Sequence, residues 1–157
     1  MANPKVYVET SVVSYLTALG SRDLVLVAHQ EVTRAWWAAR GSFDIYISQL
    51  VLDEAAAGNV EAAARRLAVL GAAPLLDVTE EATSLAARLL ADGGLPAKAR
   101  LDALHVAVAT VHGMDYLLSW NCTHIANAIL RGRIEAICRI SGFAPPVICT
   151  PLELVEE

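Results

Sequence analysis

The apolar and β-branched positions at the start of the chain predict a short strand that runs straight into an acid. Residues 4–8 (PKVYV) have the composition of a strand, and Glu9 follows them directly. The next pair, Thr10 and Ser11, is well suited to cap a helix, which we expect over residues 12–19. Open α/β sheets bind ligands in the crevice beyond the carboxyl ends of their strands. Glu9 is therefore the first candidate functional residue.

Further along the chain, apolar residues recur with two different periods. A spacing of three and four residues predicts amphipathic helices, and alternation over a few residues predicts strands. Glycines, prolines and capping residues mark the ends of these segments. The predicted helices cover residues 22–40, 49–57, 60–70, 79–90, 99–111, and then either 124–130 with 133–141 or one kinked helix; the predicted strands cover 43–47, 74–78, 115–120 and 147–150.

Strands that are separated by helices indicate a parallel sheet covered on both faces. We therefore predict an α/β fold, a three-layer α/β/α sandwich whose parallel sheet has about five strands. A chain of 157 residues has the length of one ordinary domain, and it contains no repeat, low-complexity tract or linker. We expect a single domain over residues 1–157, with an acidic tail, 153–157, that frays.

Composition narrows the class of protein. No apolar run approaches the ~20 residues that a membrane span needs, and there is no secretory signal pattern. The three cysteines are odd in number and lack a metal-binding spacing, so we expect reduced thiols in a cytoplasmic protein with no membrane association. The net charge of −5 argues against a non-specific nucleic-acid coat. It is compatible with an enzyme acting on nucleic acid, because bound divalent cations reverse the local sign of a carboxylate site.

Several polar side chains are predicted to meet at one edge of this sheet. Glu9 ends the first strand, and Asn121 lies just beyond residues 115–120. Asp53 and Glu54 lie on the helix after the second strand, and Asp102 lies in the first turn of the helix before the fourth. Carboxylate and amide oxygens are the ligands that Mg²⁺ and Mn²⁺ prefer. The pattern therefore predicts a divalent-cation site.

Each of these acids also has an ordinary structural interpretation. Asp102 suits a partner of the helix dipole, and Glu54 suits a solvated helix face. Periodicity does not separate Asp53 from Glu54. Glu9 is harder to explain in this way, because a glutamate at a strand end has no obvious local structural role.

Four separated motifs of the chain resemble those of PIN domains. They are residues 6–16 (VYVETSVVSYL), 47–54 (ISQLVLDE), 102–107 (DALHVA) and 115–121 (DYLLSWN). Their order and spacing and the chain length all fit, so the resemblance covers nearly the entire sequence. Among PIN domains, the chain is most similar to the VapC-type toxins of bacterial toxin–antitoxin pairs.

The resemblance implies an enzyme with four catalytic positions. These are Glu9, Glu54, Asp102 and Asn121, with Glu9 and Asp102 as ligands of one or two Mg²⁺ or Mn²⁺ ions, and it leaves Asp53 as a surface acid. The family usually has Asp at the first position and often at the last. Glu9 is one methylene longer and Asn121 gives up a charge, so we expect a second ion to be held less tightly or to be absent.

The same resemblance implies the reaction and the partners. The expected activity is that of a metal-dependent endoribonuclease that hydrolyses RNA phosphodiesters and leaves 5′-phosphate ends. The expected partners are the RNA substrate, a cognate antitoxin protein that covers the site, and a second copy of the chain in a homodimer. RNA rather than DNA follows from the resemblance alone.

Four further residues are candidate RNA contacts with structural alternatives. Thr10 and Ser11 either cap the first helix or contact a metal-bound water or a phosphate. Lys98 and Arg100 either meet a phosphate backbone or are solvated loop charges.

The histidines give a weaker signal. His105 follows Asp102 by three positions and shares its helical face, so it either shuttles protons or is a packed, hydrogen-bonded side chain. The other three are scattered, and no pair has a zinc-binding spacing: His29, His112 and His124.

Two other functions compete with the nuclease. If the Glu and Asn substitutions abolish turnover, the chain is a silent PIN-like module that binds RNA or protein. A metal-dependent phosphatase is the third hypothesis, because the same cluster of oxygen ligands suits the hydrolysis of a phosphate monoester.

Overall fold

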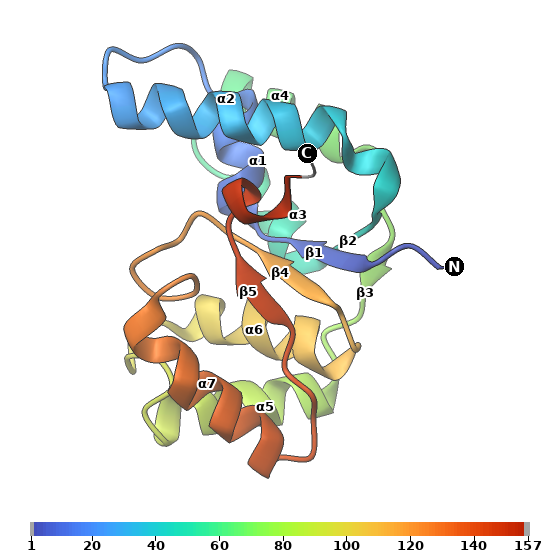
Figure 1. Cartoon of the computed structure of the whole chain (residues 1–157), viewed down its shortest axis with the longest axis vertical. Coiled ribbons are helices and arrows are strands. Elements are labelled where there is room, and N and C mark those ends of the chain that lie inside the picture. The colour runs from blue at the N-terminus through green and yellow to red at the C-terminus, as the bar shows by residue number, and fades with distance from the viewer. Residues whose placement is uncertain (1, 156–157) are drawn as a thin grey trace.

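The computed structural model of the protein describes residues 2–155, and its sheet has the predicted number of strands (Figure 1). The spatial order is β3-β2-β1-β4-β5, and every neighbouring pair is parallel. The α/β prediction with a five-stranded parallel sheet is thus confirmed. The strands are β1 (Lys5–Val8), β2 (Asp44–Ser48), β3 (Leu75–Leu76), β4 (Tyr116–Leu118) and β5 (Val147–Cys149).

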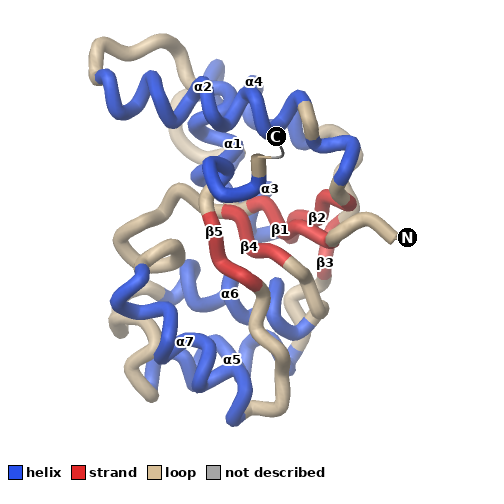
Figure 2. Tube along the Cα trace, in the orientation of Figure 1, coloured by secondary structure: helices blue, strands red, loops and turns tan. Residues whose placement is uncertain are grey.

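Helices cover both faces of this sheet and make the three predicted layers (Figure 2). On one side lie α1 (Thr10–Thr17), α2 (Leu24–Ala38), α3 (Gln49–Ala55) and α4 (Val60–Leu70), with the short 3₁₀ helices η1 (Arg40–Ser42) and η2 (Pro151–Leu154). On the other side lie α5 (Glu80–Ala91), α6 (Arg100–Val111) and α7 (Ala128–Ile140). Within residues 2–155, no helix is long and apolar enough to cross a membrane.

The first helix begins earlier than the sequence predicts. It starts at Thr10, and its N-cap is Glu9, whose side chain accepts a hydrogen bond from the backbone N–H of Ser11. The capping role predicted for Thr10 and Ser11 is therefore wrong. A carboxylate satisfies a free N–H at a helix start as well as a hydroxyl does, and its charge also suits the positive end of the helix dipole.

The region after β4 also differs from the prediction. Residues 122–126 form turns instead of a helix, and α7 begins at Ala128 and continues through Gly132 without a break. The side chains of two asparagines explain this difference, because each bonds to a nearby backbone N–H and so competes with helix formation. Asn121 accepts from His124 N at 3.1 Å, and Asn127 caps α7.

Two smaller differences concern the third strand and the tail of the chain. The third strand comprises two residues instead of the predicted 74–78. In the tail, Glu153 belongs to η2, where it forms a capping box with Thr150; the fraying of 153–157 stays a prediction. Residues 156–157 lie outside the described part of the chain.

The central strand is the most buried part of the molecule. Val6, Tyr7 and Val8 of β1 have 0% of their surface exposed, because helices pack on both faces and strands flank both edges of β1. Most of the buried polar residues gather just past the carboxyl ends of the strands or face them: Glu9, Thr10, Ser48, His105 and Ser119. Buried polar groups need hydrogen-bond partners, so this edge must contain a polar network.

Packing around the loop between α5 and α6 gives a test of the fold. A Cβ at the buried Gly94 would lie 2.9 Å from Ile137 Cδ1 and 3.2 Å from Leu89 O. We expect Gly94→Ala to lower the free energy of unfolding by about 1–3 kcal/mol. The matched control is Gly132→Ala in α7, where the added Cβ meets nothing within 4 Å. There the higher helix propensity of alanine should raise the free energy of unfolding by about 1 kcal/mol. Urea denaturation measures both, and equal effects of the two variants would contradict this packing.

Candidate metal centre

The polar network lies at the point where the strand order reverses. β1 is flanked by β2 on one side and by β4 on the other, so the chain leaves β1 in one direction and returns beside it in the other. Such a switch point opens a crevice at the carboxyl ends of the strands. Glu9 N donates to Leu118 O at 3.0 Å, which joins the ends of β1 and β4 where Glu9 and Asn121 emerge.

Glu9 is a buried carboxylate that accepts three hydrogen bonds. Only 5% of its surface is exposed. Its Oε2 accepts from Ser11 N at 3.0 Å, and its Oε1 accepts from the hydroxyls of Ser11 and Ser119, the latter at 2.6 Å. A buried charge is costly unless it is hydrogen-bonded, so these donors explain how Glu9 is tolerated.

Glu54 reaches the same place from α3. Its Oε1 accepts from the Thr10 hydroxyl at 2.9 Å and from Nε2 of His105. Burial raises the pKa of Glu54, but the hydrogen bond and charge of His105 and the bond from Thr10 lower it, and the net result is a pKa below the ordinary value. Glu54 is therefore ionised at neutral pH.

His105 projects from α6 and is itself part of a chain of hydrogen bonds. Its Nδ1 lies 2.7 Å from the Tyr7 hydroxyl, which lies 2.7 Å from Ser48 Oγ. Burial raises the pKa of Tyr7, so the phenol keeps its hydrogen. Ser48 is the N-cap residue of α3, but within residues 2–155 its hydroxyl makes no capping bond to that helix. The sequence left two interpretations of His105, a proton shuttle or a packed, hydrogen-bonded side chain. In the structure, His105 is buried and hydrogen-bonded.

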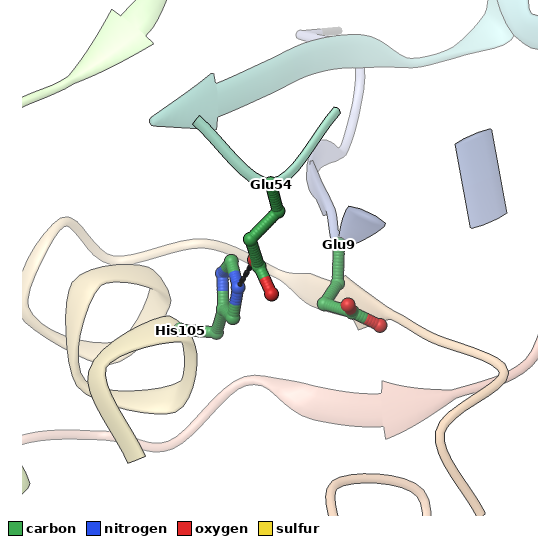
Figure 3. A group of neighbouring side chains, drawn as sticks. All are labelled: Glu9, Glu54 and His105. Carbon is green, nitrogen blue, oxygen red and sulfur yellow. Dashed lines mark hydrogen bonds and ion pairs between the residues drawn. The ribbon is translucent and has the colours of Figure 1, made fainter. Parts of the chain in front are cut away.

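Three side chains thus form an acid–histidine group, Glu9, Glu54 and His105 (Figure 3). One ligand atom from each lies within 4.8 Å of the others. Figure 3 shows Glu54 between His105 and Glu9, with the dashed line joining it to the imidazole. Two carboxylates this close repel each other, and a divalent cation would relieve that repulsion. The two carboxylates of this group fit Mg²⁺ or Mn²⁺, which prefer oxygen ligands.

Asp102 and Asn121 lie in a neighbouring part of the network. Asp102 is not among the ligand atoms of the acid–histidine group in residues 2–155; its Oδ2 lies 2.8 Å from His124 Nδ1. Asn121 accepts the backbone N–H of His124 through Oδ1, and its own N–H donates to Ser119 Oγ at 2.9 Å. Since Ser119 also donates to Glu9, hydrogen bonds connect Glu9 with Asn121. Glu54 has no direct bond to this network within residues 2–155; it bonds to the hydroxyl of Thr10, the residue that follows Glu9 in the chain.

The four predicted RNA contacts have different surroundings. Thr10 bonds to Glu54 and Ser11 bonds to Glu9, so both hydroxyls hold carboxylates. Lys98 is exposed before α6. Arg100 is exposed and lines a hollow against α5 together with Leu104. A contact between these residues and RNA remains a prediction.

Four residues of the network were not predicted as site residues: Tyr7, Ser48, Ser119 and His124. Ser119 donates to Glu9, and His124 contacts Asp102. For Ser119 and His124, position in the sequence was the available signal. Ser119 lies at the end of a predicted strand, and His124 comes three residues after Asn121. Neither residue type is distinctive enough on a strand end or in a turn to indicate a partner far away in the sequence.

Comparison with known proteins agrees with this geometry. The family model described as PIN domain matches residues 6–121, which include Glu9, Glu54, Asp102 and Asn121. Comparison with curated proteins gives no match, and comparison with solved structures gives none. PIN domains are generally nucleases and typically use divalent metals. With more than half of its length covered by the family model, and with carboxylates gathered at the switch point of a parallel sheet, the chain belongs to the PIN-domain family.

Proposed function

We propose that this protein is a Mg²⁺- or Mn²⁺-dependent endoribonuclease and the toxin of a toxin–antitoxin pair. The observation that carries the proposal is the acid–histidine group, Glu9 and Glu54 with His105, at the switch point of a PIN-domain sheet. RNA as the substrate and the toxin role rest on the resemblance of the motifs to VapC-type toxins.

The residues that would hold the cation come from three elements. Glu9 after β1 and Glu54 on α3 offer carboxylate oxygens close to each other. We propose Asp102 on α6 as a further ligand, because its Oδ1 accepts no hydrogen bond from residues 2–155. When bound, a divalent cation supplies Lewis acidity, which lowers the pKa of a water nucleophile and stabilises charge on the phosphate.

The chain's own residues orient the reacting groups. Hydrolysis requires a water molecule in line with the departing 3′ oxygen, and that geometry leaves a 5′-phosphate. Donors from Ser11, Ser119, Thr10 and His105 fix the rotamers of Glu9 and Glu54 before substrate arrives. Preorganised groups of this kind contribute to catalysis because they need no reorganisation during the reaction.

The proposal is tested by incubating the purified protein with a pool of RNA, with and without Mn²⁺. We expect cleavage only with the cation, and products with 5′-phosphate ends. Binding of the RNA without cleavage would instead support the silent module. A single-stranded DNA pool and a chromogenic phosphate monoester, tested in parallel, measure the choice of substrate.

Partners are tested in growing bacteria. We propose that a cognate antitoxin covers the acid–histidine group and that the protein is a homodimer. Expression of the chain should arrest growth, and co-expression of a small protein encoded next to its gene should restore it. Sedimentation of the purified chain gives the oligomeric state.

The first mutational prediction concerns Asp102. Asp102→Asn keeps the shape and an oxygen for His124, but it removes a charge next to the proposed cation. We expect RNA cleavage to fall by about a hundredfold or more, since even partners of metal ligands typically contribute about 10–100-fold. Stability should change by less than about 1 kcal/mol. Asp53→Asn is the control that should leave cleavage unchanged, because Asp53 is exposed and its side chain bonds only to Gln49 among residues 2–155. Full activity of Asp102→Asn at saturating Mg²⁺ would remove Asp102 from the site.

The second prediction concerns Glu9, which is both an N-cap and a proposed ligand. In Glu9→Gln, a single acceptor oxygen faces donors from Ser11 and Ser119. We therefore expect the free energy of unfolding to fall by about 1–3 kcal/mol and Mn²⁺ binding to weaken as well. Glu9→Asp should move the carboxylate by about 1 Å, which can lower the rate about a hundredfold.

Calorimetric titration with Mn²⁺ beside a thermal melt separates the two roles of Glu9. Glu61→Gln is the control, because Glu61 is an exposed glutamate in the first turn of α4. A lower melting temperature with an unchanged Mn²⁺ isotherm would show that Glu9 is a structural carboxylate only.

A further inference from the structure

The hydrogen bonds to Glu54 are unevenly divided between its two oxygens. Both donors, the Thr10 hydroxyl and His105 Nε2, bond to Oε1. No donor within residues 2–155 bonds to Oε2. The bonds therefore hold the carboxylate by one oxygen and leave the other to accept a ligand on the side of Glu9.

The direction of each hydrogen bond follows from the groups involved. An ionised carboxylate can only accept, so Nε2 of His105 carries the hydrogen between it and Glu54. In the neutral ring, Nδ1 then accepts from the Tyr7 hydroxyl, and the Tyr7 oxygen accepts from Ser48. In the charged ring, whose charge helps to lower the pKa of Glu54, Nδ1 donates to the Tyr7 oxygen and Nε2 keeps its hydrogen. In either form of the ring, the chain Ser48–Tyr7–His105–Glu54 ends with Nε2 of the imidazole donating to the acid.

Burial shows on which side of Glu54 a cation would bind. The His105 side chain is 0% exposed, whereas 32% of the Glu54 side chain is exposed. The imidazole therefore lies behind the carboxylate as seen from solvent, where an RNA phosphate must approach. As a direct ligand, His105 would have to give up its bond to Glu54 and carry its hydrogen on Nδ1 instead.

We propose that His105 is a positioning residue, which holds Oε1 of Glu54 through its Nε2–H and so presents Oε2 to the divalent cation. This inference rests on the proposed metal-dependent function. Tyr7 and Ser48 act one and two steps further back, because they orient the imidazole. Partners of this kind around metal sites typically contribute about 10–100-fold to metal affinity or activity.

The test compares two substitutions at the same buried position. His105→Leu fills the space without a donor, and we expect Mn²⁺ affinity, measured by calorimetry, to fall about 10–100-fold. His105→Gln places an amide N–H where Nε2 lies, and we expect it to recover most of the wild-type affinity. Tyr7→Phe should have a smaller effect than His105→Leu. The matched control is His112→Gln, because His112 caps the other end of α6 and bonds to Asp77 O.

NMR of the wild-type protein tests the proposal without any variant. A long-range ¹H–¹⁵N spectrum should show hydrogen on Nε2 of His105 both before and after addition of Mg²⁺. Loss of that hydrogen on addition of Mg²⁺ would make His105 a direct ligand and overturn the positioning role.

The outcomes also separate this inference from the proposed function. If the wild-type protein binds no Mn²⁺ or Mg²⁺, the metal-dependent function fails and the positioning role fails with it. If the wild-type protein binds Mn²⁺ and folded His105→Leu binds it equally well, the function stands and only the role of His105 is overturned.

Discussion

The buried carboxylate of Glu9 joins three parts of the fold. It directly follows β1, it caps α1 by accepting the Ser11 N–H, and it accepts the hydroxyl of Ser119 beyond β4. A charge that is 5% exposed is stable only with such donors, so the helix start and both strand ends must meet correctly for the charge to be tolerated. The backbone bond from Glu9 N to Leu118 O strengthens the same junction.

The rest of the candidate centre depends on this junction. Because α1 begins immediately after Glu9, Thr10 is placed to bond to Glu54 on α3. His105 on α6 approaches Glu54 from the other side of the sheet. Two acids are thereby held close to each other against their mutual repulsion. Departures of this kind from simple packing rules are expected at functional sites.

The two positions that depart from the usual PIN-domain pattern are connected through Ser119. Its hydroxyl donates to Glu9, and it accepts the backbone N–H of Asn121. Asn121 in turn directs its side-chain oxygen to the backbone of His124, whose ring contacts Asp102. The longer acid and the amide are therefore accommodated by one set of contacts. The side-chain oxygen of Asn121 already has a protein donor, which limits what it can offer to a cation.

The sequence by itself determined the parallel α/β fold, because apolar periodicity and capping residues define each helix and strand through residues that are close together in the chain. These signals do not depend on how the helices and strands pack. The sequence also identified Glu9, since a strand end followed by a helix start places an acid at the ligand-binding edge. Three results needed the tertiary structure: Glu9 rather than Thr10 as the cap, the contact of His105 with Glu54, and the contact of His124 with Asp102. Glu54 and His105 are separated by 51 residues. Helical spacing places His105 and Asp102 on one face, but only the packing of α6 against its neighbours decides which partner each side chain reaches.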